Sequence, residues 1–143
     1  MKIGSNGLDL IKNFEGLYLK SYKCPAGVWT IGYGTTGDDV FEGLKITQEQ
    51  AESELVGDID SVCDHVEQDI TFPLSDNQFS AVVSLVYNIG ISAFLKSTIL
   101  QKLNKGDISG SAKEFMRWNK IKGVASPGLT RRRKAEMDLF LKV

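Results

Sequence analysis

One segment of the chain, residues 17–36, differs in character from everything that follows it. β-Branched and aromatic side chains recur there and are separated by glycines and by Pro25, a texture typical of short strands joined by tight turns. From residue 47 onward the apolar residues keep helical spacing instead. A length of 143 residues suits about one domain with a real core. The sequence therefore predicts a single α+β domain, mostly α, with a small antiparallel sheet near its N-terminus.

Caps and helix breakers set the expected boundaries. Ser5 and Ser75 are predicted N-caps, and Thr47 with Gln50 has the form of a capping box. The first turn of the sheet is expected near residues 24–27. We expect a β-rich lobe over about residues 15–46, a connecting helix over about 47–67, and a helical lobe over about 73–143 that contains one helix over 91–103, a glycine-rich loop over 123–128 and a last helix over about 130–141.

Charge is distributed unevenly along the chain. Twelve acidic side chains and one lysine lie between Asp38 and Asp76, whereas twelve basic and four acidic side chains follow from Lys96 to the end. A basic half favours a polyanionic partner, either nucleic acid or an anionic polymer such as bacterial cell wall. The alternative is that two oppositely charged segments attract each other or face solvent on opposite sides.

The cysteines and the hydropathy of the chain limit which classes of protein it can belong to. Cys24 and Cys63 are too few for a disulfide framework, and neither has a metal-ligand spacing with His65, so we expect no metal and no cofactor. Residues 1–6 lack a continuous apolar run, and residues 77–95 contain amides and serines. We therefore expect no signal peptide, no membrane anchor and synthesis as a soluble cytoplasmic protein.

Glu15 is a charged residue at a position where the helical pattern predicts an apolar one. It continues the helical stripe of Leu8 and Ile11, so it is expected to face the core or a cleft wall, where burial favours the protonated carboxyl. A protonated carboxylic acid is what general acid catalysis requires. The alternatives are a solvated glutamate at the end of the helix or a glutamate paired with an arginine.

The spacing of Glu15, Cys24 and Thr30, nine and six residues apart, resembles the Glu-x8-(Asp or Cys)-x5-Thr motif of phage-type lysozymes, the endolysins of glycoside hydrolase family 24. The resemblance continues in order through nearly the whole chain. It includes residues 46–52, 81–90, 102–107, Arg117-Trp118 and 128–133, with Phe94 and Ser97 between them.

This resemblance implies a lysozyme-like fold and hydrolysis of the β-1,4 bond between N-acetylmuramic acid and N-acetylglucosamine in peptidoglycan, which lyses the host cell. Glu15 would protonate the leaving oxygen and Thr30 would position water. Cys24 would act as a base, as an electrostatic stabiliser or as a nucleophile, and these three roles stay open here. Lys20 and Lys23 are expected to lower the pKa of the Cys24 thiol.

The same resemblance places Thr36, Tyr87, Asn88 and Ser97 at positions near bound saccharide. The basic run of Arg131, Arg132 and Arg133 is expected at a helix N-terminus, where cations are unfavourable to the helix dipole. One of these arginines is expected to pair with Glu15 or to contact the wall, and the alternative is a solvated patch.

Other functions remain as alternatives: a lytic transglycosylase on the same fold, a non-catalytic wall-binding domain, and a helical nucleic-acid binder. Thr30 and a polar residue at position 24 favour the hydrolase, and no nucleic-acid-binding motif is recognisable. We therefore expect peptidoglycan as partner, no nucleic acid, no stable membrane insertion and a monomer. The enzyme would remain in the host cytoplasm until a holin permeabilises the membrane, and would then act on the wall in the periplasm.

Overall fold

The computed structural model describes residues 1–142 and divides into two compact units. The sheet unit is Ile11–Ser61, and the helical unit combines Met1–Leu10 with Val62–Val143. The boundaries fall inside two helices, α1 (Ser5–Glu15) and α2 (Gln48–Asp69). The single-domain boundaries expected from the sequence stay a prediction.

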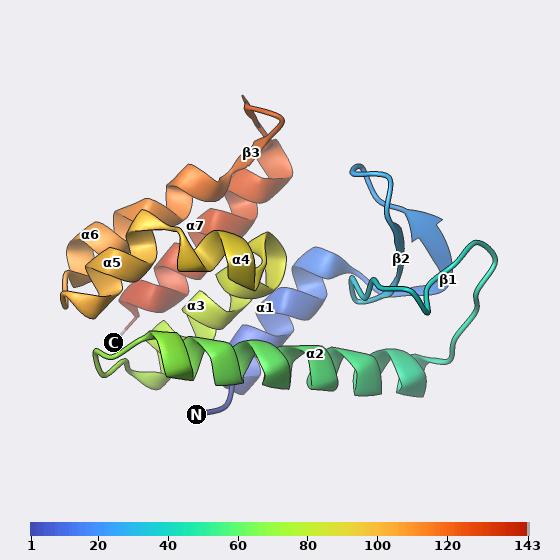
Figure 1. The fold of residues 1–143 in the computed structure, drawn as a ribbon, viewed down its shortest axis with the longest axis horizontal. Coiled ribbons are helices and arrows are strands. Elements are labelled where there is room, and N and C mark those ends of the chain that lie inside the picture. Colours follow the sequence, from blue (N-terminus) through green and yellow to red (C-terminus); the bar gives the residue numbers. More distant parts are fainter. Residues whose placement is uncertain (143) are drawn as a thin grey trace. The chain divides into compact units, whose positions relative to one another are not determined.

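The sheet unit is built around one hairpin. Strand β1 (Tyr18–Lys23) pairs antiparallel with β2 (Trp29–Gly32), and the register sets Tyr22 opposite Thr30. The expected turn is present, since the Cys24 amide donates to the Val28 carbonyl at 3.0 Å. Figure 1 shows this hairpin in blue, between α1 and the loop that leads to α2.

The beginning of α2 confirms the predicted capping box. The Thr47 amide donates to Gln50 Oε1 at 2.8 Å, and the Gln50 amide donates to Thr47 Oγ1 at 3.2 Å. These two bonds satisfy amides that the first turn of a helix leaves without partners. In the sheet unit the first turns of α2 bury Ala51, Leu55 and Ile59, at the helical spacing that the sequence displays.

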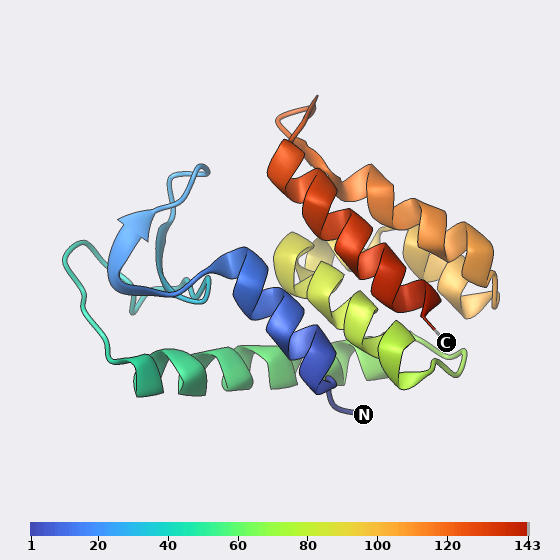
Figure 2. The same cartoon turned by 180° about the vertical axis from the view of Figure 1, so that it is seen from behind.

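The helical unit packs its helices around α3 (Asp76–Ile89) and α7 (Pro127–Leu141), which lie side by side in Figures 1 and 2. Ser75 and Gln78 form a second capping box at the start of α3, as predicted. The rings of Phe115 and Phe140 meet at 5.4 Å between centroids. The other elements of the unit are α4 (Ile91–Leu95), α5 (Thr98–Asn104), α6 (Ile108–Glu114), the 3₁₀ helix η1 (Phe115–Trp118), β3 (Lys120–Ile121) and β4 (Val124–Ala125).

The single helix expected over residues 91–103 is wrong. The structure ends α4 at Leu95 and begins α5 at Thr98, with Ser97 in extended backbone between them. The Ser97 hydroxyl accepts from the Leu100 amide at 3.3 Å and donates to the Phe94 carbonyl. A serine that bonds nearby backbone in this way offers an alternative to continuing the helix.

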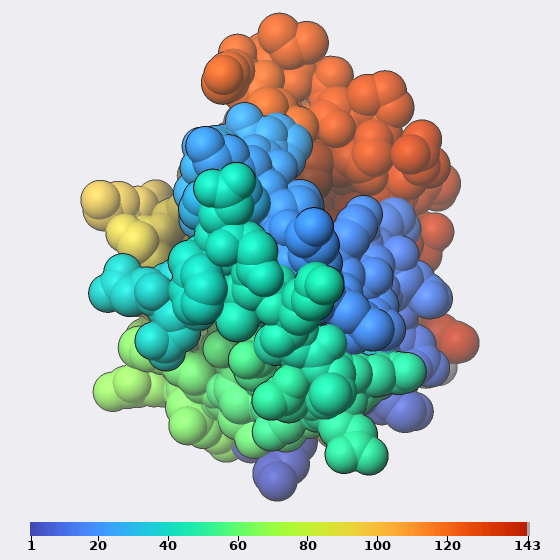
Figure 3. Space-filling model, turned by 90° about the vertical axis from the view of Figure 1, so that its right-hand side faces the viewer, coloured from blue at the N-terminus to red at the C-terminus, as the bar shows by residue number. Residues whose placement is uncertain are grey.

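The glycine-rich loop expected over residues 123–128 is also wrong. Strands β3 and β4 form a hairpin whose turn residues Lys122 and Gly123 have φ of 50° and 81°. Positive φ at both positions is typical of a tight two-residue hairpin turn. Helix α7 then begins at Pro127, earlier than expected, with Ser126 as its N-cap. In Figure 3 the atoms at the top of the view, in orange, belong to this hairpin region.

No helix within the described residues is long and apolar enough to cross a membrane.

Candidate active site

The sheet unit brings Cys24 and Thr30 to one face of its hairpin. Thr30 stands opposite Tyr22 in the register, and Cys24 lies two residues beyond Tyr22. Side chains two apart along a strand share a face, so these three side chains lie together. Lys23 and Trp29 form the neighbouring register pair, with the Lys23 ammonium 5.4 Å from the centre of the Trp29 ring, and this pair occupies the other face.

Hydrogen bonds favour the ionised form of the Cys24 thiol. Backbone hydrogen bonding at Val28 lowers the pKa of this thiol most, partial burial opposes the shift, and hydrogen bonds from Ala26, the Thr30 hydroxyl and Gly27 lower the pKa further. A tight turn therefore surrounds the sulfur with donors that stabilise a thiolate. The direction expected from the sequence is correct, whereas the expected cause, Lys20 and Lys23, is wrong.

Thr30 is buried, with 4% of its surface exposed. Its hydroxyl donates to the Val28 carbonyl at 3.0 Å and also lies within hydrogen-bonding reach of Cys24. A hydroxyl carries a single hydrogen, so Thr30 donates to one of these acceptors at a time and offers its lone pairs to another group. This is a suitable environment for a water molecule that must be held and deprotonated.

Glu15 is the last residue of α1 and is half-buried, rather than buried in the core. Gly16 follows it with φ of 72°, the left-handed conformation that commonly ends a helix. The chain then turns directly into β1. The helix end and the hairpin therefore belong to one continuous stretch of the sheet unit.

Tyr22 is a site residue that sequence reasoning missed. Burial raises the pKa of its phenol, and so do the charges of Tyr18, Glu15 and Cys24, in that order. The Tyr22 phenol therefore senses both Glu15 and Cys24, and it stays neutral and able to donate a hydrogen bond. The two-residue step from Tyr22 to Cys24 is the sequence pattern from which its position follows.

The predicted saccharide-binding residues lie in both units. Thr36 is exposed in the sheet unit, just after the bridge between Ile31 and Thr35. In the helical unit, Tyr87 is half-buried and Asn88 exposed near the end of α3, whereas Ser97 is buried as the N-cap of α5. Their predicted role in binding saccharide stays a prediction, and the hydroxyl of Ser97 already serves the backbone.

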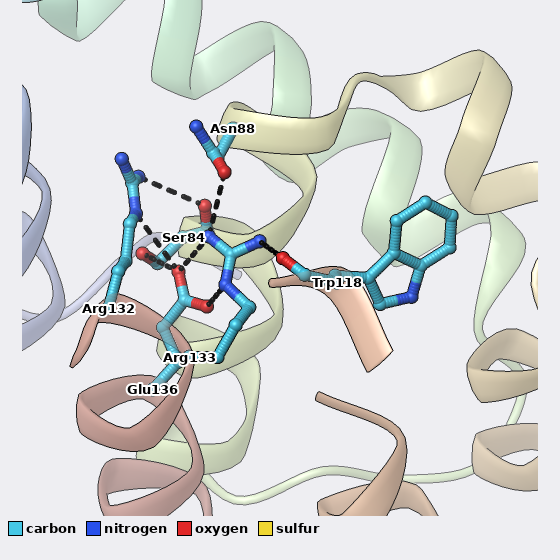
Figure 4. Close-up of polar contacts among 6 residues, drawn as sticks. All are labelled: Ser84, Asn88, Trp118, Arg132, Arg133 and Glu136. Atoms are coloured by element: carbon cyan, nitrogen blue, oxygen red, sulfur yellow. Dashed lines mark hydrogen bonds and ion pairs between the residues drawn. The ribbon is translucent and has the colours of Figure 1, made fainter. Parts of the chain in front are cut away.

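The basic run at the start of α7 is not a solvated patch. Arg131 is exposed, but Arg132 and Arg133 are buried together with Glu136. Arg133 Nε lies 2.7 Å from Glu136 Oε1, and Arg132 Nε lies 3.3 Å from Glu136 Oε2. Figure 4 shows both guanidinium groups converging on this carboxylate, which also accepts from the Ser84 hydroxyl.

The charge of Glu136 is balanced inside the helical unit. Burial raises the pKa of its carboxyl, whereas the charges of Arg133 and Arg132 and the Ser84 hydroxyl lower it. The i to i+3 and i to i+4 spacings place both arginines beside Glu136 on one side of α7. The same spacing is visible in the sequence, where Glu136 follows the arginine run, but the basic run by itself does not indicate this partner.

Comparisons with known proteins agree over the whole chain. The phage lysozyme family matches residues 12–136. The endolysin of Acyrthosiphon pisum secondary endosymbiont phage 1 is 51% identical over 144 residues, covering 98% of each chain. Two solved structures superpose closely. The endolysin from Escherichia coli O157:H7 phage FAHEc1 has a TM-score of 0.89 and 44% identity, covering 99% of this chain and 94% of the other.

The muramidase domain of SpmX from Asticaccaulis excentricus has a TM-score of 0.91 and 38% identity, and the match covers 99% of each chain. These structures confirm the predicted lysozyme-like α+β fold. The predicted enzyme class, a lysozyme-type glycosidase directed at the peptidoglycan of the host cell wall, is confirmed as well. The chain belongs to the phage lysozyme family.

Proposed function

We propose that this lysozyme hydrolyses the β-1,4 bond between N-acetylmuramic acid and N-acetylglucosamine, with Glu15, Cys24 and Thr30 as its catalytic residues. One observation carries the proposal: the hairpin sets Cys24 beside Thr30 and surrounds its sulfur with hydrogen-bond donors. A thiol whose thiolate form is stabilised by hydrogen bonds, next to a buried hydroxyl, matches the need for a base and a water-holding group opposite the acid. The similarity to a muramidase domain supports the same bond.

The proposed reaction has one step with two proton transfers. Glu15 gives its proton to the glycosidic oxygen while the bond from that oxygen to the anomeric carbon breaks. A water held by Thr30 adds its oxygen to the anomeric carbon and gives a proton to the Cys24 thiolate. The products are a reducing end and a free 4-hydroxyl, and proton exchange with solvent then restores Glu15 and Cys24.

Glu15→Gln tests the acid. The amide keeps the size of the side chain and removes the transferable proton, so the rate of wall lysis should fall about 10²–10⁴-fold while folding survives. Glu42→Gln is the matched control, because Glu42 is an exposed residue of the same unit. Near wild-type lysis by folded Glu15→Gln would refute the assignment.

The products test the reaction and the role of Cys24. Mass spectrometry of digested peptidoglycan should show reducing muramic acid ends, whereas anhydro ends would indicate a transglycosylase, and absence of products a binding domain. A base at position 24 predicts an inverted anomer by proton NMR. A retained anomer or a thioglycosyl adduct would assign Cys24 as nucleophile instead. Cys24→Asp should retain substantial activity and Cys24→Ala should lose it.

We also propose that the chain acts as a monomer and reaches the wall through a membrane lesion made by a holin. Expressed alone, it should accumulate without lysing the cell, and co-expression of a holin should trigger lysis. Export of the chain by the secretion machinery without a holin would contradict this route. Light scattering of the purified chain should give the mass of one copy, 15.8 kDa.

A further inference from the structure

The Glu136 cluster, formed by Glu136, Arg132, Arg133 and Ser84, is connected to the surface through the exposed side chain of Asn88. Glu136 and Arg133 are fully buried, with 0% of their surfaces exposed. Arg133 contacts Glu136 through Nε and, at 3.4 Å, through Nη2, and both Nη atoms also reach groups outside this ion pair. Nη2 donates to Asn88 Oδ1 at 2.8 Å, and Nη1 donates to the Trp118 carbonyl at 3.3 Å. Figure 4 shows the Asn88 amide at the end of this chain of contacts.

The chemistry of arginine fixes the orientation of the Asn88 amide. A guanidinium group has five N–H donors and no acceptor, so only the amide oxygen can face Arg133. Rotating the amide by half a turn would set two donors against each other and break a charge-assisted hydrogen bond. Arg133 is itself held by the buried carboxylate, so it provides a rigid anchor for Asn88.

The remaining half of the amide is available to a ligand. Asn88 is exposed and lies one residue before the end of α3. Within the part of the chain that the structure describes, its Nδ2 has no hydrogen-bond partner. The side chain therefore presents two N–H donors, and no acceptor, to the outside.

We propose that Asn88 is a specificity-determining donor for the acetamido carbonyl oxygens of the glycan, and that Arg133 and Glu136 are the positioning residues that fix its polarity. A sugar hydroxyl both donates and accepts, so it would tolerate either orientation of an amide. An acetamido carbonyl oxygen only accepts, so it binds the amide only when the N–H groups face the sugar. A fixed orientation of Asn88 therefore favours the acetamido group over a hydroxyl. This inference rests on the proposed function, because it assumes a glycan of N-acetylated sugars.

The test compares two substrates prepared from the same wall: peptide-free glycan strands with their acetyl groups, and the same strands after de-N-acetylation. Asn88→Asp keeps the shape of the side chain but replaces the donors with an acceptor. It should raise KM for the acetylated strands about tenfold, the worth of one hydrogen bond, with little change in kcat. For de-N-acetylated strands, whose amines are cationic, KM should stay level or fall.

Two further variants complete the design. Gln101→Glu makes the same amide-to-acid change at an exposed position of α5 and should leave both KM values unaltered. Arg133→Lys keeps a cation near Glu136 but lacks the fork that reaches Asn88, so it should raise KM for the acetylated strands severalfold. In the double variant, Arg133→Lys should raise KM at most about twofold above that of Asn88→Asp alone, because the two substitutions remove the same contact with the glycan.

Two results would overturn the inference: an unchanged KM of Asn88→Asp on acetylated strands, or equal increases on both substrates. Thermal melting of each variant checks folding, and if Arg133→Lys fails to fold, Asn88→Asp alone decides. Failure of the wild-type enzyme to cleave acetylated strands would instead refute the proposed function. The substrates are free of peptide, so a donor that recognises peptide carbonyls would show no effect of Asn88→Asp on KM.

Discussion

Glu136→Gln should destabilise the protein far more than Glu114→Gln, although both carboxylates are buried and each is paired with two cations. Glu136 is paired with Arg132 and Arg133, whose side chains are only 4% and 0% exposed. Removal of its charge leaves two guanidinium groups in the protein interior without this counter-charge. A buried cation that loses one of its counter-charges cannot replace it with hydration unless the structure opens.

Glu114 provides the matched comparison. Its partners Lys102 and Arg117 have side chains that are 35% and 71% exposed. When Glu114 becomes glutamine, both cations remain solvated, and the amide oxygen can still accept from Lys102. The expected cost is about 1 kcal/mol, the upper range for exposed ion pairs. Breaking the buried pair at Glu136 should cost about 3–5 kcal/mol.

Thermal and urea unfolding of the purified variants measure this difference. With about 3 °C per kcal/mol for a chain of this size, the Tm should fall about 10–15 °C for Glu136→Gln and about 3 °C for Glu114→Gln. The free energy of unfolding of a domain is about 5–15 kcal/mol. Glu136→Gln should therefore still fold at low temperature, where its unfolding can be measured. If the two variants lost the same free energy of unfolding within about 1 kcal/mol, burial of the cations would not be the cause.

Further predictions concern the sheet unit and the charged surface. Alkylation of Cys24 by iodoacetamide should show a pH midpoint below that of an ordinary exposed thiol, because hydrogen bonds stabilise its thiolate, and Thr30→Val should raise that midpoint. The Tyr22 phenol should titrate above its ordinary value in tyrosine carbon NMR, and Glu15→Gln should lower its pKa by removing a nearby negative charge. Burial and the neighbouring carboxylates raise the pKa of Glu54 above its value in the unfolded chain. The folded protein therefore loses stability as the pH rises and this carboxyl ionises. Glu54→Gln should therefore stabilise the protein by about 0.3 kcal/mol at neutral pH, with no gain in acid, as measured by urea unfolding. Whole-cell lysis should weaken at high salt while cleavage of short neutral oligosaccharides stays level, because salt screens attraction beyond about 8–10 Å; equal salt dependence would exclude steering by the basic half.

Elements with local chemical signatures were predictable from the sequence. The capping boxes at Thr47 and Ser75 depend on side chains three residues apart, and both are present. The break at Ser97 was not predicted, because apolar periodicity continues across it. The β3–β4 hairpin was missed because its turn uses Lys122 at positive φ, where asparagine or glycine would have indicated the turn.

The candidate catalytic residues were found by their spacing, but their electrostatics were only partly predictable. The donors that lower the pKa of Cys24 are backbone groups of a turn, and no side-chain pattern reveals their direction. Lysines were the visible cations, and Lys23 lies against Trp29 instead. The burial of Arg132 and Arg133 follows from packing of α7 against α3, a contact between segments far apart in the sequence.

The reactivity of the two cysteines can report the opening of helix α2 in the native chain. Cys24 is half-buried in a turn, whereas Cys63 is 2% exposed in the middle of α2. A thiol reagent should modify Cys24 quickly and reach Cys63 only when that part of α2 opens. In a Cys24→Asp background, the slow modification rate of Cys63 divided by that of a free thiol gives the equilibrium constant of opening. Its dependence on urea separates local fraying from global unfolding, without any added label.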